Sequence, residues 1–336
     1  KVYITDLSIF NQLINYTISL DRESIIDFVQ ALCDVTAQAL VEKPPRYSML
    51  HSLENVAVLN MDRPMIIWRE IWQIISSLFV KFGGLEDNNE VVKNVLSVFQ
   101  TLSSPFIQRP ETPKMHHKGL FLQPYIDIFH ISNTLEIKIY IIDIIVYLIQ
   151  KFGDNLQSGW EVVMQVIIAT ASSQQLILRG IDIQEVVTKN LCYIKEYKPE
   201  LLLTAVCAFA SQEKKGRIAL QAVGLFPLIA AGLSQIDTEI WISLFISLAS
   251  SQASSIQEVR NATESSTISI ILRHGFAHKE VETPTRRRLK SSGSFRLSRA
   301  NSEEVITNEN SQIEDGTHES NEQNAAKEIP TQETAV

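Results

Sequence analysis

The sequence predicts an all-α fold: a solenoid of helical hairpins of the HEAT or armadillo type over residues 1–278, followed by a disordered C-terminal tail. Three observations predict it. Apolar residues recur at helical spacing almost throughout, the loops between the periodic windows are short, and predicted helix pairs recur about every 40 residues. Beyond residue 278 apolar residues thin out, so residues 279–336 cannot bury enough surface to offset the entropy of ordering.

Residues that interrupt helices mark the elements in order. Two interruptions are Lys43-Pro44-Pro45 and Gly83-Gly84, and the others fall at residues 108–118, 153–158 and 198–199. The clearest window between them places its apolar residues on one broad helical face: Val91, Val92, Val95, Leu96, Val98, Phe99, Leu102 and Phe106. Residues 134–150 are rich in Ile and would suit a strand, but their length without a turn residue favours a buried helix.

The most strongly patterned helix lies within residues 60–84. Asp62 is expected to cap it, and Pro64 is expected to lie in its first turn. Trp68 and Trp72 are four residues apart, so their indoles are expected to stack on one face. The same face carries Ile71, Ile75, Leu78, Phe79 and Phe82. We expect this apolar stripe to pack in the core; the alternative is a partner groove, in which rigid aromatic side chains are favoured anchors.

Similar helix ends and starts favour a repeat architecture. Three predicted helices end on a cation, a ring and a glycine that can adopt left-handed geometry: Lys81-Phe82-Gly83, Lys151-Phe152-Gly153 and Arg273-His274-Gly275. Helices also begin alike, with an acid at Glu90, Glu136 and Glu258. The alternative is that capping rules alone produce such similarities in any helical protein.

Composition argues against several classes of function. A formal net charge of −8 disfavours a nucleic-acid partner, which usually needs a basic face. Cys33, Cys192 and Cys207 lie far apart and are predicted to be buried, reduced thiols. His116-His117 has no further ligand at metal spacing, so a solvated loop pair is expected. The sequence therefore predicts no catalytic residue, no metal ion and no cofactor, and its most apolar run, Ile137–Ile149, is too short to span a bilayer.

The predicted tail separates its charges, basic first and then acidic. Residues 283–300 carry six cations and no acid, whereas residues 301–336 carry nine acids and one lysine. The cations that lie close to phosphate acceptors are Arg286, Arg287, Arg288 and Lys290, just before Ser291, and Arg299, just before Ser302. This pattern predicts a stretch that binds an anionic membrane surface and is released by phosphorylation. The alternative is a solvated linker without a role.

Several motifs together resemble one protein family. Asn60-Met61-x-Arg63, Trp68-x-x-Ile71-Trp72, Phe121-Leu122-x-Pro124 and Ser158-Gly159-Trp160 stand here in the same order as in the large Golgi Arf exchange factors, the brefeldin-A-inhibited guanine nucleotide-exchange proteins. The region concerned lies downstream of their catalytic Sec-seven module, and the resemblance is best over residues 18–190. The chain departs from the family at Met65, where a second Arg is usual, and at Glu70, where a basic residue is usual.

The resemblance implies a role without catalysis, because nothing in the chain matches the Sec-seven module. It implies a regulatory and membrane-targeting segment of an Arf exchange factor in Golgi vesicle-mediated transport, cytoplasmic and peripheral on trans-Golgi membranes. The implied partners are an activated Arf-type GTPase, other segments of the same exchange factor and an anionic Golgi membrane surface. The alternative is a free-standing helical-repeat scaffold for protein–protein interaction with no exchange activity.

We expect two groups of residues in the resembling region to have different roles. Arg63 and Arg69 lie off the apolar stripe, so we expect them to contact an acidic partner surface. The remaining signature residues are expected to be structural: Asn60, Met61, Trp68, Ile71, Trp72 and Trp160.

Overall fold

The computed structural model describes residues 7–111, 116–190, 199–212, 214–233 and 238–274. Backbone contacts separate the chain into two units, Lys1–Lys279 and Glu280–Val336, and every described residue belongs to the first. The predicted disordered tail therefore lies outside the described residues, together with its basic stretch and its two candidate phosphoserines.

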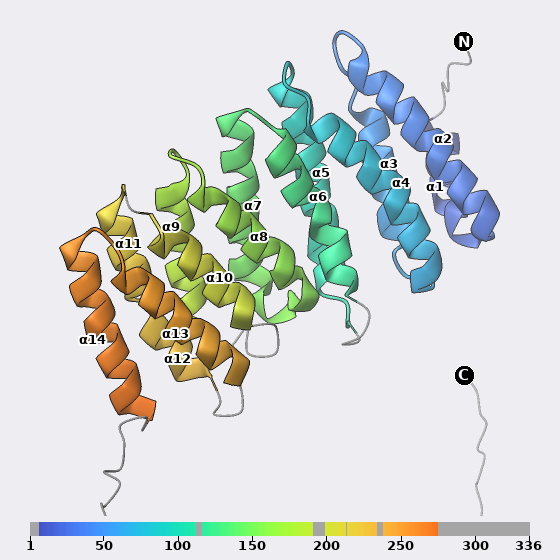
Figure 1. Cartoon of the computed structure of the whole chain (residues 1–336). Coiled ribbons are helices and arrows are strands. Elements are labelled where there is room, and N and C mark those ends of the chain that lie inside the picture. Colours follow the sequence, from blue (N-terminus) through green and yellow to red (C-terminus); the bar gives the residue numbers. More distant parts are fainter. Residues whose placement is uncertain (1–6, 112–115, 191–198, 213, 234–237, 275–336) are drawn as a thin grey trace, which may run out of the picture. The chain divides into compact units, whose positions relative to one another are not determined.

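Every regular element within the described ranges is a helix, which confirms the predicted all-α class (Figure 1). The α-helices are α1 (Leu7–Tyr16), α2 (Arg22–Val41), α3 (Ser48–Asn60), α4 (Met65–Gly83), α5 (Asn89–Ile107), α6 (His117–Ile131), α7 (Leu135–Phe152), α8 (Trp160–Ala171), α9 (Ile177–Lys189), α10 (Pro199–Ala210), α11 (Gly216–Val223), α12 (Phe226–Gly232), α13 (Thr238–Gln252) and α14 (Gln257–His274). Short 3₁₀ helices occupy Thr17–Ser19 (η1), Gly153–Asn155 (η2) and Gln157–Gly159 (η3).

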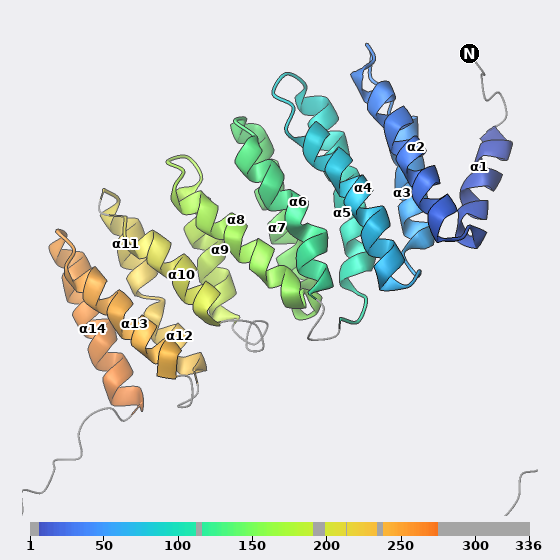
Figure 2. The same ribbon diagram turned by 45° about the vertical axis from the view of Figure 1, so that its right-hand side comes forward.

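The helices of this unit form two layers. In layer A, α2, α4, α6, α8, α10 and α13 each pack against the next in that order. In layer B, α1, α3, α5 and α7 pack in succession, as do α9, α11 and α14. Figures 1 and 2 show the layer A helices side by side from two directions. Alternation between layers along the chain is the arrangement of an α-solenoid built from helical hairpins, as the sequence predicts.

Polar contacts between neighbouring hairpins repeat at nearly constant sequence separation. Asn60 donates to Thr17 and Lys93 pairs with Glu136, and each pair is 43 residues apart. Ser158 donates to Glu111 across 47 residues. Helix-pair repeats of this type measure about 40–47 residues, so these contacts support a repeat rather than capping rules alone. Glu136, one of the acids expected at a helix start, lies in the first turn of α7 and contacts α5 through Lys93.

The apolar stripe of α4 lies in the core, which confirms the packing prediction. Trp68 and Trp72 are 1% and 6% exposed, and their rings stack with centroids 6.3 Å apart. Trp72 also stacks on Phe121 of α6, with ring centroids 4.1 Å apart, and lies 5.5 Å from the ring of Phe99 in α5. Aromatic packing thus joins three consecutive helices, α4, α5 and α6. The Ile-rich stretch at 134–150 lies within α7, a helix with a buried face, as expected.

Two local predictions about α4 are wrong. Asp62 does not cap this helix, which begins at Met65 with no side-chain cap; its carboxylate pairs with Arg109 at 2.8 Å instead. Gly83 and Gly84 do not adopt left-handed geometry. A Cβ atom at Gly83 would stand 2.5 Å from Ile128 Cδ1, and one at Gly84 would stand 2.7 Å from Ile131 Cγ2. These glycines therefore permit close approach of α6 rather than an unusual turn.

The corresponding prediction for Gly153 is also wrong, because this residue has right-handed geometry with φ −48° and opens η2. Gly275, at the third similar helix end, lies outside the described residues.

Helix α2 is long and apolar enough, by length and composition, to cross a membrane. Its apolar residues Ile25, Val29 and Leu32 are buried in the solenoid, whereas Asp27 and Asp34 are exposed. This two-sided pattern is that of a core helix with one solvated face.

Candidate binding surface on layer A

Arg63, predicted to meet a partner, is engaged within the fold. Its guanidinium donates hydrogen bonds to the carbonyls of Thr17 (2.7 Å), Ile18 (3.1 Å) and Leu20 (2.7 Å), where η1 leads into α2. A fourth bond goes to Asn60 Oδ1 at 2.6 Å. Arginine presents several donors in a rigid fork, which suits it to collecting such carbonyls. Partner contact by Arg63 stays a prediction, but this side chain also holds two hairpins together.

The neighbouring signature residues complete this contact. Asn60 is buried, and its amide donates to Thr17 Oγ1 and to Val56 O, both at 2.9 Å. Met61 is buried, and its carbonyl accepts a hydrogen bond from Arg109. The structure thus accounts for Asn60, Met61 and Arg63 as parts of a junction between η1, the α3–α4 link and the end of α5.

Arg69 has a different environment. It is exposed and forms no ion pair among the residues that the structure describes. Burial lowers the pKa of His117, and the positive charge of Arg69 acts in the same direction. Partner contact by Arg69 also stays a prediction, and its side chain is available for it.

A polar cluster that the sequence did not indicate surrounds Glu111. Its carboxylate accepts hydrogen bonds from the Ser158 backbone N–H (3.1 Å), the Ser158 hydroxyl (2.7 Å) and the Lys118 N–H (3.0 Å). Lys118 is 3% exposed, and its Nζ donates to Asn155 O and Gln157 Oε1 at 2.6 and 2.7 Å. Burial lowers the pKa of Lys118, and the charge of Glu111 opposes this effect.

This Glu111 cluster ties the start of α6 to η3 and to the start of α8, where Trp160 is buried. Its polar groups are paired with one another, so we interpret it as structural. It could not be recognised in the sequence, because Glu111 and Ser158 are 47 residues apart.

The thiols of Cys33 and Cys207 both have raised pKa values. Burial raises the pKa of Cys33 to about 12, so its thiol stays protonated at neutral pH. Burial also raises the pKa of Cys207, which is half-buried. Cys33 is a buried, free thiol as predicted, whereas Cys207 is free but only half-buried, so the prediction of burial is wrong for Cys207. Cys192 lies outside the described residues. No group of three possible metal ligands occurs in the part of the chain that the structure describes.

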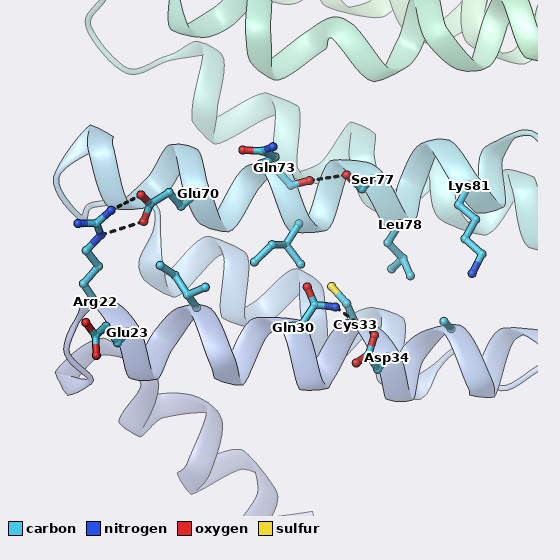
Figure 3. Close-up of a pocket in the computed structure, with 13 residues that line it drawn as sticks. Arg22, Glu23, Gln30, Cys33, Asp34, Glu70, Gln73, Ser77, Leu78 and Lys81 are labelled. Atoms are coloured by element: carbon cyan, nitrogen blue, oxygen red, sulfur yellow. Dashed lines mark hydrogen bonds and ion pairs between the residues drawn. The ribbon is translucent and has the colours of Figure 1, made fainter.

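A groove of about 760 Å³ runs between α2 and α4 in layer A (Figure 3). Arg22 and Glu70 bridge it at one end through a paired ion contact, in which Arg22 Nε lies 2.9 Å from Glu70 Oε2. The hydrogen bond from Arg22 lowers the pKa of Glu70. This ion pair accounts for the acidic side chain at position 70.

A second groove of about 490 Å³ lies between α4 and α6. Ser77 and Lys81 of α4 line both grooves, so the two grooves adjoin along α4 and together border three helices. We call the two together the layer A groove. Its lining is mixed in polarity, with the partly buried Ile26 and Ile74 and the buried Leu78 between polar side chains. Such a surface can bind a macromolecular segment, and it presents no catalytic constellation.

Comparisons with known proteins give one family and a set of relatives. A family described as "Mon2/Sec7/BIG1-like, HDS" matches residues 105–185, from the end of α5 into α9. The chain is 26% identical over 234 residues to brefeldin A-inhibited guanine nucleotide-exchange protein 2 of Arabidopsis thaliana, covering 68% of the chain and 13% of that relative. It is 27% identical over 252 residues to protein 4 of the same plant, covering 70% of the chain and 15% of that relative.

An animal relative shows the same similarity over a shorter range. The chain is 28% identical over 156 residues to brefeldin A-inhibited guanine nucleotide-exchange protein 1 of Mus musculus, covering 46% of the chain and 8% of that relative. The chain thus spans less than a sixth of the length of these relatives. The matched family segment contains the whole Glu111 cluster and Trp160.

Proposed function

Because the chain has a Sec7-like HDS domain and is homologous to the brefeldin A-inhibited guanine nucleotide-exchange proteins, we propose that it is a non-catalytic regulatory segment of an Arf guanine nucleotide-exchange factor. In this proposal it binds activated Arf and helps to hold the exchange factor, as a peripheral protein, on trans-Golgi membranes during vesicle-mediated transport. Residues 1–278 form the regulatory solenoid, and residues 279–336 form a tail that meets anionic lipid through its basic half.

The family match at residues 105–185 carries this proposal. The matched domain is HDS, a part of these exchange factors other than the Sec7 catalytic domain. The α-solenoid supports the proposal, because stacked hairpins offer extended surfaces for protein partners.

Arf binding can be tested with the purified chain and Arf loaded with GTPγS or GDP on liposomes. We expect the chain to sediment with GTPγS-loaded Arf and much less with GDP-loaded Arf. Equal sedimentation with both, or with neither, would contradict the proposal. Fluorescent-GDP release from Arf should proceed at its spontaneous rate when the chain is added, and a several-fold acceleration would show that the chain is catalytic.

Arg69 provides the sharper variant. Arg69→Glu reverses the charge of an exposed side chain that has no ion pair in the described structure, so the fold should stay intact. Weaker binding of GTPγS-loaded Arf would support a role of Arg69 at the interface. Arg217→Glu, in α11, is a matched control, because Arg217 is also exposed and without an ion pair among the described residues.

A further inference from the structure

Three consecutive helices of layer A carry a glutamine toward the layer A groove: Gln30 in α2, Gln73 in α4 and Gln123 in α6. Four residues after each glutamine stands a second polar residue that also lines the groove: Asp34, Ser77 and Asp127. Figure 3 labels Gln30 and Asp34 on α2 and Gln73 and Ser77 on α4.

Hydrogen bonds fix the two outer pairs alike. Gln30 Nε2 donates to Asp34 Oδ1 at 3.1 Å, and Gln123 Nε2 donates to Asp127 Oδ1 at 3.0 Å. Each of these amides keeps one N–H and its carbonyl oxygen for another partner. The middle glutamine, Gln73, forms no side-chain hydrogen bond among the described residues; Ser77 Oγ donates to its backbone carbonyl instead. The result is a row of amide groups, one per repeat, exposed in a groove.

A row of amides suits the main chain of an extended peptide. An extended segment exposes both N–H and C=O groups, and a side-chain amide can satisfy one of each. Packed helices lie about 8–10 Å apart, so crossing from α2 to α6 takes roughly 20 Å, or about six extended residues. A peptide running across the helices would therefore meet one glutamine every two to three residues.

The charges of the groove select the side chains of such a peptide. Its lining contains the acids Glu23, Asp34, Glu70 and Asp127 and the cations Arg22 and Lys81. Arg22 and Glu70 neutralise each other, which leaves three acids and one cation. Neither Asp34 nor Asp127 forms an ion pair in the described part of the chain. The balance favours Lys or Arg and disfavours an anionic membrane or a nucleic acid.

We propose that the layer A groove binds an extended peptide rich in Lys or Arg, with Gln30, Gln73 and Gln123 holding its backbone and Asp34 and Asp127 pairing with its side chains. The apolar stems of those side chains pack between the helices, on Ile26, Ile74 and Leu78. Arg69, the proposed Arf contact, does not line this groove, so different variants test the two proposals and either can fail alone.

The test measures fluorescence anisotropy of labelled decapeptides with the full 336-residue chain. The probes are a Lys-Ser repeat, a Glu-Ser repeat, and the Lys-Ser repeat with N-methyl groups on alternate backbone amides. We expect the Lys-Ser peptide to bind, the Glu-Ser peptide not to bind, and N-methylation to weaken binding at least tenfold. Equal binding of the acidic peptide would overturn the charge argument, and indifference to N-methylation would overturn recognition of the backbone.

Variants locate the site. Gln73→Leu should weaken Lys-Ser binding about fivefold, and the triple change of the three glutamines to Leu should weaken it roughly 100-fold, since each lost hydrogen bond is modest in strength. Gln38→Leu is the control, because Gln38 is exposed on α2 but does not line the groove. Similarly, Asp34→Asn should weaken binding, and Asp27→Asn, on the same helix outside the groove, should not.

Hydrogen exchange of the unmodified chain gives a readout that does not depend on any variant. The Lys-Ser peptide should slow exchange in α2, α4 and α6. If the groove variants bind like the unmodified chain, or if protection appears only elsewhere, the proposed site is wrong.

Discussion

Truncation of Trp72 tests the packing of the solenoid most directly. This side chain is 6% exposed and contacts aromatic rings from three helices: Phe79 in α4, Phe99 in α5 and Phe121 in α6. Its indole N–H has no hydrogen-bond partner among the described residues, so Trp72→Ala removes packing rather than a polar contact. Replacing a buried Trp by Ala typically costs about 3–5 kcal/mol, and aromatic pairs add about 0.5–1.5 kcal/mol each.

We therefore expect Trp72→Ala to lower the free energy of unfolding by about 5 kcal/mol, the upper end of that range. The ring contacts several helices, so the helices around it cannot move independently to fill the cavity that the substitution leaves. For a domain of this size each kcal/mol lowers the melting temperature by roughly 2–4 °C, which predicts a fall of roughly 10–20 °C. Circular dichroism and urea unfolding measure it. Ile66→Ala is the control on the same helix, because Ile66 is 68% exposed and its loss should change stability by less than about 0.5 kcal/mol.

Two outcomes would refute this reasoning. If Trp72→Ala melts like the unmodified chain, the ring does not carry the packing that its contacts indicate. If it melts normally and loses Arf binding, the stripe is a partner surface in solution. Trp72→Phe should cost much less than Trp72→Ala, because a phenyl ring keeps most of the stacking on Phe121.

Three further predictions follow from individual groups. Glu111→Ala should destabilise the fold by about 2–4 kcal/mol in urea unfolding, since three donors lose their acceptor; an unchanged midpoint would argue against the cluster. The hydrogen bond from Arg22 lowers the pKa of Glu70 from its ordinary value of 4.5. The stability that this ion pair contributes is therefore fully present above pH 4.5 and is lost as the pH falls through the lowered pKa. Glu70→Gln should flatten the acid side of the pH–stability profile, and an unaltered profile would contradict this. Residues 283–300 should bind anionic liposomes weakly, and replacing Ser291 and Ser302 by Asp should abolish this binding. Sedimentation at low and high salt measures it, and binding that is insensitive to salt would rule out the electrostatic mechanism.

The structure also changes how a charge reversal at Arg63 should be interpreted. Arg63→Glu removes the hydrogen bonds that the guanidinium donates to three carbonyl oxygens at the η1–α2 junction. These carbonyl oxygens then lose a hydrogen-bond donor, which destabilises the junction. We expect this variant to melt at a lower temperature than Arg69→Glu. Weaker Arf binding by Arg63→Glu would then report on the fold as much as on an interface, whereas Arg69→Glu separates the two.

The sequence by itself determined the helices and the faces that they bury. The stripe from Trp68 to Phe82 and the helix at 135–152 were predictable because helical periodicity is a property of neighbouring residues. Local rules failed where tertiary contacts compete with them. Asp62 pairs with Arg109 rather than capping α4, and Gly83 admits Ile128 rather than turning the chain.

Only the tertiary structure decided which polar residues meet. Arg22 and Glu70 are 48 residues apart, Lys93 and Glu136 are 43 apart, and Ser158 and Glu111 are 47 apart. Each pair depends on the register in which one hairpin stacks on the next, and no local pattern in a single sequence encodes that register. The layer A groove and its row of glutamines arise in the same way, because a groove exists only once helices from successive repeats lie side by side.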